Sequence, residues 1–168
     1  MKKTFLILMS SVAVLLVWTL FLTYERANGT PLVVEIEGFD PRSLIAGRYI
    51  AFQIKYKADL TCGDKRTYSV EPSYFCWETK KITRGKPSDC PVFFKGECRW
   101  GRFSDNLSRY YVPEIDADAL DRDFQKRDLK FELLLSVTKR GDAYAKELLI
   151  DGKSWRERYR SKTADSGS

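Results

Sequence analysis

Histidine is absent from the 168 residues of this chain. Its absence excludes Ser-His-Asp and Cys-His catalysis, and it excludes every metal site that needs an imidazole ligand. Carboxylate chemistry, Ser-Lys chemistry or no chemistry at all remain. We therefore expect no bound metal, no cofactor and no catalytic residue.

Acidic residues are absent before Glu25, although the whole chain carries 23 of them against 29 basic residues. Two of the basic residues, Lys2 and Lys3, lie in this acid-free stretch, so the part from Glu25 onward carries 27 − 23 = +4. That excess is too small to argue for a nucleic-acid partner, and no nucleic-acid-binding motif accompanies it. We expect no nucleic acid among the partners.

Charge of either sign is absent from Thr4 to Tyr24. Twenty-one helical residues span about 31 Å, which matches the hydrocarbon core of a bilayer. The run is longer than the apolar part of a cleavable signal peptide and lacks a small-x-small site, although a long signal peptide cut near residue 28 is the alternative. The sequence thus predicts a transmembrane signal-anchor over residues 4–24, in contact with membrane lipid.

The positive residues before this span predict its orientation, because Lys and Arg are enriched on the cytoplasmic side. Residues 1–3 would be cytoplasmic, residues 25–30 a linker, and the remainder would lie outside the cytoplasm. For a bacterium this means a single-pass inner-membrane protein with a periplasmic or extracytoplasmic domain.

Closely spaced cysteine pairs are also absent, which argues against a four-cysteine zinc site without excluding it. The four cysteines lie in the exported part, where disulfides are stable. A nested arrangement, Cys62–Cys98 around Cys76–Cys90, fits a hairpin whose strands run out and back. Sequential pairing, Cys62–Cys76 and Cys90–Cys98, remains open.

Alternating apolar residues and turn signals predict the fold of residues 31–155. Apolar side chains recur at every second position from Ile50 to Tyr56, which is typical of a half-buried strand. Residues 115–127 carry the spacing of a short helix, whereas residues 128–152 read as a hairpin. We predict an α+β, β-rich domain with an antiparallel sheet and one short helix, followed by a basic, Ser-rich flexible tail over residues 156–168.

The stretch DPRSLIAGRYIAFQIKY, residues 40–56, joins a turn to this strand. Gly47 is interpreted as a backbone joint that ends the turn. A loop that binds an anion through Arg48 is the functional alternative.

Three segments together resemble the GDYXXLXY family of membrane-anchored bacterial proteins, which has no assigned activity. They are the stretch above, SRYYVPE at residues 108–114 and KELLIDGKSW at residues 146–155. Gly47 and Tyr49 of the naming motif are kept as structural positions, whereas Arg48 stands where the family has Asp. The resemblance implies a single-pass anchor, a β-rich exported domain and a multi-pass membrane protein as partner.

The function predicted from these observations is that of a non-catalytic accessory or interaction subunit of a membrane protein assembly. The candidate binding residues are Arg48, Tyr49, Arg109 and Tyr111. The alternative is a Ser-Lys hydrolase that resembles a type I signal peptidase, with Ser43 as nucleophile and Lys55 as base. Lys55 shares the polar face of its strand, where a solvated amine keeps a high pKa and is a poor base.

Overall fold

The computed structural model describes residues 2–39, 49–62, 71–124, 126 and 128–159. Side chains are described for these residues except 2–8, 38, 39, 118 and 121. The predicted joint at Gly47, the candidate anion ligand Arg48 and the candidate nucleophile Ser43 lie outside the described residues.

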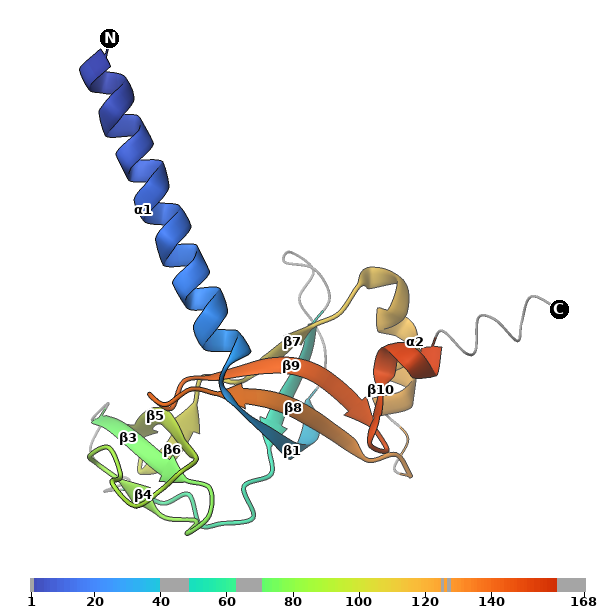
Figure 1. Ribbon diagram of the computed structural model, residues 1–168. Helices are drawn as coiled ribbons and strands as arrows, with labels where there is room; N and C mark the ends of the chain where they lie inside the picture. The colour runs from blue at the N-terminus through green and yellow to red at the C-terminus, as the bar shows by residue number, and fades with distance from the viewer. Residues whose placement is uncertain (1, 40–48, 63–70, 125, 127, 160–168) are drawn as a thin grey trace, which may run out of the picture.

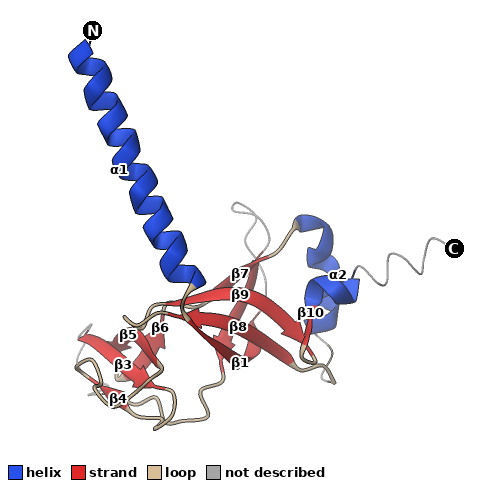
Figure 2. Cartoon of the chain, in the orientation of Figure 1, coloured by secondary structure: helices blue, strands red, loops and turns tan. Residues whose placement is uncertain are grey.

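The larger of two sheets contains six strands in the order β10-β9-β8-β1-β2-β7 (Figures 1 and 2). Every pairing within it is antiparallel. Its strands are β1 (Thr30–Phe39), β2 (Tyr49–Ile54), β7 (Arg109–Tyr111), β8 (Phe131–Val137), β9 (Ala143–Ile150) and β10 (Lys153–Ser154).

The smaller sheet contains four antiparallel strands in the order β4-β3-β5-β6 and lies beside the larger one in Figure 1. Its strands are β3 (Glu71–Cys76), β4 (Ile82–Thr83), β5 (Phe93–Arg99) and β6 (Arg102–Asp105). Helix α2 (Glu114–Phe124) connects β7 to β8. The prediction of a β-rich protein with antiparallel sheets and few helices is therefore confirmed.

The predicted alternation in β2 is confirmed by burial. Ile50, Phe52 and Ile54 are buried, whereas the side chains between them are half-buried or exposed. The same alternation recurs in β8, where Phe131 and Leu133 face the core. A strand places successive side chains on opposite faces, so a period of two produces one buried and one solvated face of the sheet.

The ring of Tyr56 joins the two sheets in one core. Tyr56 follows β2, and its ring lies edge-on to Phe75, Phe94 and Phe103 of the smaller sheet, with centroids 4.7, 5.9 and 6.1 Å away. Edge-to-face pairs of this kind add stability beyond the area that they bury. The smaller sheet is thus packed against the larger one as part of the same hydrophobic core.

Helix α2 confirms the short helix predicted at residues 115–127. Ala117 and Leu120 face the core, and Phe124 stacks on Phe131 with ring centroids 3.8 Å apart. The helix begins at Glu114, so Asp116 lies in its first turn.

Helix α1 (Lys2–Ala27) projects from the β-rich domain in Figure 1. In the part of the chain that the structure describes, no helix has the length and apolarity that a membrane crossing requires. The span predicted over residues 4–24 stays a prediction. Because α1 continues to Ala27 and β1 begins at Thr30, only Asn28 and Gly29 of the predicted linker over residues 25–30 lie between the two elements.

The packed part of the chain also continues past the predicted boundary at residue 155. Residues 155–159 are helical. Trp155 is 2% exposed, and its indole nitrogen donates a hydrogen bond of 3.2 Å to the hydroxyl of Tyr110. Residues 156–159 of the predicted tail continue this helical segment, and the hydroxyl of Tyr159 donates a hydrogen bond to Asp123 of α2.

Candidate functional site

Three of the four candidate binding residues lie together on the larger sheet. Tyr49 of β2 is the cross-strand partner of Tyr111 of β7, and their rings meet edge-on with centroids 6.0 Å apart. The guanidinium carbon of Arg109 lies 4.8 Å from the centroid of the Tyr49 ring. We call Tyr49, Arg109 and Tyr111 the edge patch, since β7 is the last strand on this side of the sheet.

The edge patch is exposed to solvent, and the strand that carries it is fixed by a buried side chain on its opposite face. Tyr111 is 61% exposed and Arg109 is also exposed. Between them in β7, Tyr110 points to the opposite face, where it is buried and bonded to Trp155. The alternation of the strand therefore presents two side chains of the patch to solvent while Tyr110 fixes the backbone that carries them.

Lys55, the candidate base of the hydrolase alternative, lies among carboxylates. Its amine is 3.1 Å from Glu35 and 3.2 Å from Glu37. The hydrogen bond to Glu35, and then that to Glu37, raises the pKa of Lys55 above its ordinary value. An amine that holds its proton more tightly than free lysine is a poor general base at neutral pH, so this geometry disfavours the Ser-Lys mechanism.

The acidic residues of α2 do not all face solvent. Asp123 is 4% exposed, and its carboxylate accepts a hydrogen bond of 2.7 Å from the hydroxyl of Tyr159. The amine of Lys126 lies 2.6 Å from the other carboxylate oxygen. No local pattern in the sequence indicates that Asp123 is buried, because Tyr159, its hydrogen-bond partner, lies 36 positions further along the chain.

A second buried pair, Tyr56 and Asp105, also escaped sequence reasoning. The Tyr56 hydroxyl donates a short hydrogen bond to the Asp105 carboxylate, whose other oxygen accepts one of 2.7 Å from the backbone nitrogen of Leu107. Burial raises the pKa of Asp105, against the lowering effect of these two donors. Burial likewise raises the pKa of Tyr56, so that its hydroxyl remains a donor. No local signal in the sequence links two residues that are 49 positions apart.

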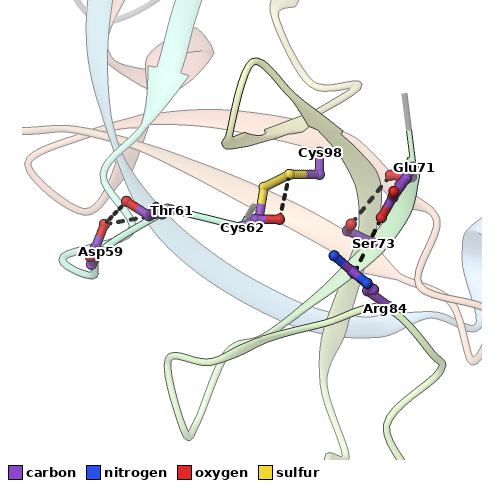
Figure 3. The surroundings of a disulfide bond; sticks show 7 residues. All are labelled: Asp59, Thr61, Cys62, Glu71, Ser73, Arg84 and Cys98. Carbon is purple, nitrogen blue, oxygen red and sulfur yellow. Dashed lines mark hydrogen bonds and ion pairs between the residues drawn. A yellow bond between two sulfur atoms is a disulfide. The ribbon is translucent and has the colours of Figure 1, made fainter. Parts of the chain in front are cut away.

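The cysteines form the nested pairs Cys62–Cys98 and Cys76–Cys90. Figure 3 shows the first bridge beside the turn in which Asp59 accepts hydrogen bonds from Thr61. It joins the segment after β2 to β5 and therefore ties the two sheets together. The second bridge lies at the other end of the β3–β5 hairpin, where Cys76 is the partner of Phe93. These two bonds exclude the sequential pairing, and a four-cysteine zinc site is excluded because no cysteine is free.

Within the described ranges, no group of three or more Cys, Asp or Glu side chains is arranged to hold a metal ion. The ion pairs found there are carboxylates with lysine or arginine, as in the group of Glu35 with Lys55 and Lys57. On the exposed face of the sheet such pairs contribute under about 1 kcal/mol each.

Comparison with known proteins identifies one family. The family described as GDYXXLXY protein matches residues 11–148, which is most of the chain. The chain therefore belongs to the GDYXXLXY family. No curated protein and no solved structure matches the chain.

Proposed function

We propose that this member of the GDYXXLXY family is a single-pass protein of the bacterial inner membrane, with its N-terminus in the cytoplasm. Its β-rich domain would lie outside the cytoplasm and act there as a non-catalytic subunit of a membrane protein assembly. The observation that carries the proposal is the long helix α1. It projects from the domain, and its own apolar side chains are exposed.

The proposed anchor uses α1 over its whole length, including residues 2–8, whose side chains lie outside the described part. It contains 26 residues. At a rise of about 1.5 Å per residue, its length is about 39 Å. The helix therefore exceeds the hydrocarbon thickness of about 30 Å that an anchor must cross.

The surface of α1 suits lipid better than water. Its large apolar side chains are exposed along its length, with Leu16 and Leu20 at 60% and 70%. Residues 4–8, whose side chains lie outside the described part, add four more apolar residues and no charge by sequence. A row of exposed leucine and valine side chains is costly in water and favourable in lipid, which supports an anchor.

The two disulfides support the proposed location of the domain. Disulfides persist in oxidising compartments such as the bacterial periplasm and are rare in the cytosol. Both bridges lie in the part of the chain after α1. This agrees with the positive residues Lys2 and Lys3 before the helix, which favour a cytoplasmic N-terminus.

Alkaline carbonate extraction of bacterial membranes that contain the full chain tests the anchor. We expect the protein to stay in the membrane pellet, whereas the double variant Leu15→Arg/Leu16→Arg should be released, because each buried arginine costs about 2.5–3.5 kcal/mol at the centre of a span. Val33→Arg adds a positive charge on the exposed face of β1 and should leave the protein in the pellet. Recovery of wild-type protein as a soluble species that begins near residue 28 would show a cleaved signal peptide instead.

A fusion of alkaline phosphatase to the C-terminus tests the orientation, because that enzyme requires an oxidising compartment to form its disulfides. We expect an active fusion. A fusion that is inactive while present in the membrane at normal amounts would place the domain in the cytoplasm and contradict the proposal.

The edge patch is the surface that we propose for the partner, a multi-pass membrane protein. Tyrosine and arginine are enriched among residues that contribute most to protein–protein binding, and the edge patch contains only these two types. Its rings and guanidinium are mutually packed. Little side-chain freedom would therefore be lost on binding.

Cross-linking in intact cells, followed by affinity capture of the full chain, tests this surface. We expect an integral membrane protein with several spans to be captured, and Arg109→Ala/Tyr111→Ala to reduce its capture at least about tenfold. Trp100→Ala, which removes an exposed aromatic from the β5–β6 turn, is the matched control and should leave capture unchanged. Equal capture by the patch variant and by wild type would exclude the edge patch as the interface.

A further inference from the structure

A cleft of about 730 Å³ lies between α2 and the helical residues 155–159. Its volume falls within the range of sites for small organic ligands. The cleft shares no residue with the edge patch. It is lined by Pro113, Ile115, Asp116, Ala119, Arg122, Asp123, Lys126, Trp155, Arg156 and Tyr159.

The apolar part of the lining suits the body of an organic molecule. Ile115 is 89% exposed and Ala119 is half-buried, whereas Trp155, which also contributes to the lining, is packed in the core. An isoleucine this exposed gains free energy when an apolar group covers it, at roughly 25 cal/mol per Å² removed from water.

Some charged side chains of the lining have an ion-pair partner and others do not. The buried Asp123 is balanced by Lys126 at 2.6 Å and lies 3.8 Å from the Nε of Arg158. Asp116 lies in the first turn of α2, where the helix dipole favours a carboxylate. Arg122 and Arg156, in contrast, form no ion pair with any residue whose side chain the structure describes, and both are exposed.

Two guanidinium groups beside an apolar surface form a recognition site for one class of ligand. The planar fork of arginine matches a carboxylate with two parallel hydrogen bonds. The Arg156 guanidinium lies 5.4 Å from the centroid of the Trp155 ring, so the cation and the aromatic surface adjoin. We propose that this cleft binds a small carboxylate with an apolar body, whose charge pairs with Arg122 and Arg156 and whose body packs on Ile115 and Ala119.

This inference is independent of the proposed membrane role, because a ligand cleft and an anchor can each be present without the other. The probe is 1-naphthoate, and its uncharged counterpart 1-naphthamide has the same apolar body. Isothermal titration of the full chain in nanodiscs of uncharged lipid, with empty nanodiscs as the blank, measures the affinity for both.

We expect 1-naphthoate to bind at one site and 1-naphthamide to bind at least about tenfold more weakly, because the amide offers no charge to the guanidinium groups. Arg122→Gln and Arg156→Gln should each weaken 1-naphthoate by about tenfold and leave 1-naphthamide unchanged. Ile115→Ala should weaken both probes. Arg102→Gln removes an exposed arginine from β6 and is the matched control, with unchanged binding of both.

Three results would each overturn the proposal. They are no detectable binding of 1-naphthoate at millimolar concentration, equal affinity for the two probes, and undiminished binding by the double variant Arg122→Gln/Arg156→Gln. Both arginines are exposed, so these variants should melt at the wild-type temperature. If one of these variants melts at a lower temperature, Arg→Lys at the same position is measured instead, because lysine keeps the charge. The affinity of the Lys variant for 1-naphthoate must then lie between the affinities of the wild type and of the Gln variant.

Discussion

The hydroxyl of Ser136 donates a hydrogen bond of 2.7 Å to the carbonyl oxygen of Arg26, and so connects β8 to the last turn of α1 across 110 positions of the chain. Ser136 is fully buried, and this bond satisfies its hydroxyl. The guanidinium of Arg26 lies 4.6 Å from the centroid of the Tyr144 ring in β9, and Arg140 forms an ion pair with Glu25. The end of α1 is therefore fastened to the β8–β9 hairpin by side chains as well as by the chain itself.

Gly29→Ala should break this junction. A Cβ at residue 29 would overlap with the Ser136 hydroxyl and lie 3.0 Å from the carbonyl oxygen of Val137, which belongs to the backbone of β8. We expect a loss of about 1–3 kcal/mol in the free energy of unfolding, as for other overpacked sites. The measurement is thermal unfolding of the full chain in detergent.

Gly85→Ala is the control for this effect, because no atom lies within 4 Å of the Cβ that it adds. It should melt at the wild-type temperature or slightly above, since alanine lowers the entropy of the unfolded chain. Equal melting temperatures for Gly29→Ala and Gly85→Ala would mean that the close approach of Gly29 to β8 has no energetic consequence.

The two disulfides should differ in their contribution to stability. The bridged cysteines are 36 positions apart in Cys62–Cys98 and 14 positions apart in Cys76–Cys90. On the chain-entropy model, loops of these lengths correspond to about 4 and about 3 kcal/mol. Cys62→Ala/Cys98→Ala should therefore lower the unfolding free energy more than Cys76→Ala/Cys90→Ala, the more so because its bridge ties the two sheets together. Denaturant titration of both variants measures the difference, and peptide mapping that linked Cys62 to Cys76 would contradict the pairing itself.

Ile54→Ala should be among the most destabilising single changes in β2. Ile54 is 7% exposed and faces the core. Its truncation leaves a cavity and should cost about 2–5 kcal/mol. Gln53 lies one position away on the exposed face. Gln53→Ala should cost under about 0.5 kcal/mol. Similar unfolding free energies for the two variants would show that the alternation does not determine which face is buried.

Asp105→Asn should change how stability depends on pH. Burial raises the folded-state pKa of Asp105 above its ordinary value of 3.8, so the folded protein binds this proton more tightly than the unfolded chain. The sign follows from linkage: between the ordinary pKa and the raised folded-state pKa, stability falls as pH rises. The Asn variant cannot titrate and should lack this fall.

Melting temperatures of the wild type and of Asp105→Asn are measured from pH 3.5 to pH 7 in the same detergent. The difference between the two melting temperatures at each pH tests this expectation. Other groups act in the opposite direction, since hydrogen bonds from Lys57 and Lys55 lower the pKa of Glu35 and its contribution is lost as pH falls. Because Glu35 is present in both proteins, its effect cancels. Parallel curves for the two proteins would mean that Asp105 keeps an ordinary pKa.

Much of the fold was predictable because its signals are local. The spacing from Ile50 to Tyr56 indicates one buried face whatever the strand packs against, and the turn signals at residues 83–89 and 140–142 mark the ends of hairpins. The nested cysteine pairing fitted a hairpin, but the sequence left the sequential pairing open. The burial of Asp123 had no local signal, because Tyr159, in the segment that covers it, lies 36 positions further along the chain.

The sequence by itself determined the alternation of β2, the β8–β9 hairpin, the short helix and the family of this protein, since each of these depends on side-chain periodicity, turn chemistry or a contiguous motif. It left the pairing of the cysteines open. Only the tertiary structure decided that Tyr49 meets Tyr111, that Tyr56 bonds to Asp105 and that Ser136 holds the end of α1. Each of these contacts depends on which strands become neighbours and in which register. That choice comes from the packing of the whole core, because many pairings satisfy the same local pattern and only one of them buries all of the apolar faces together.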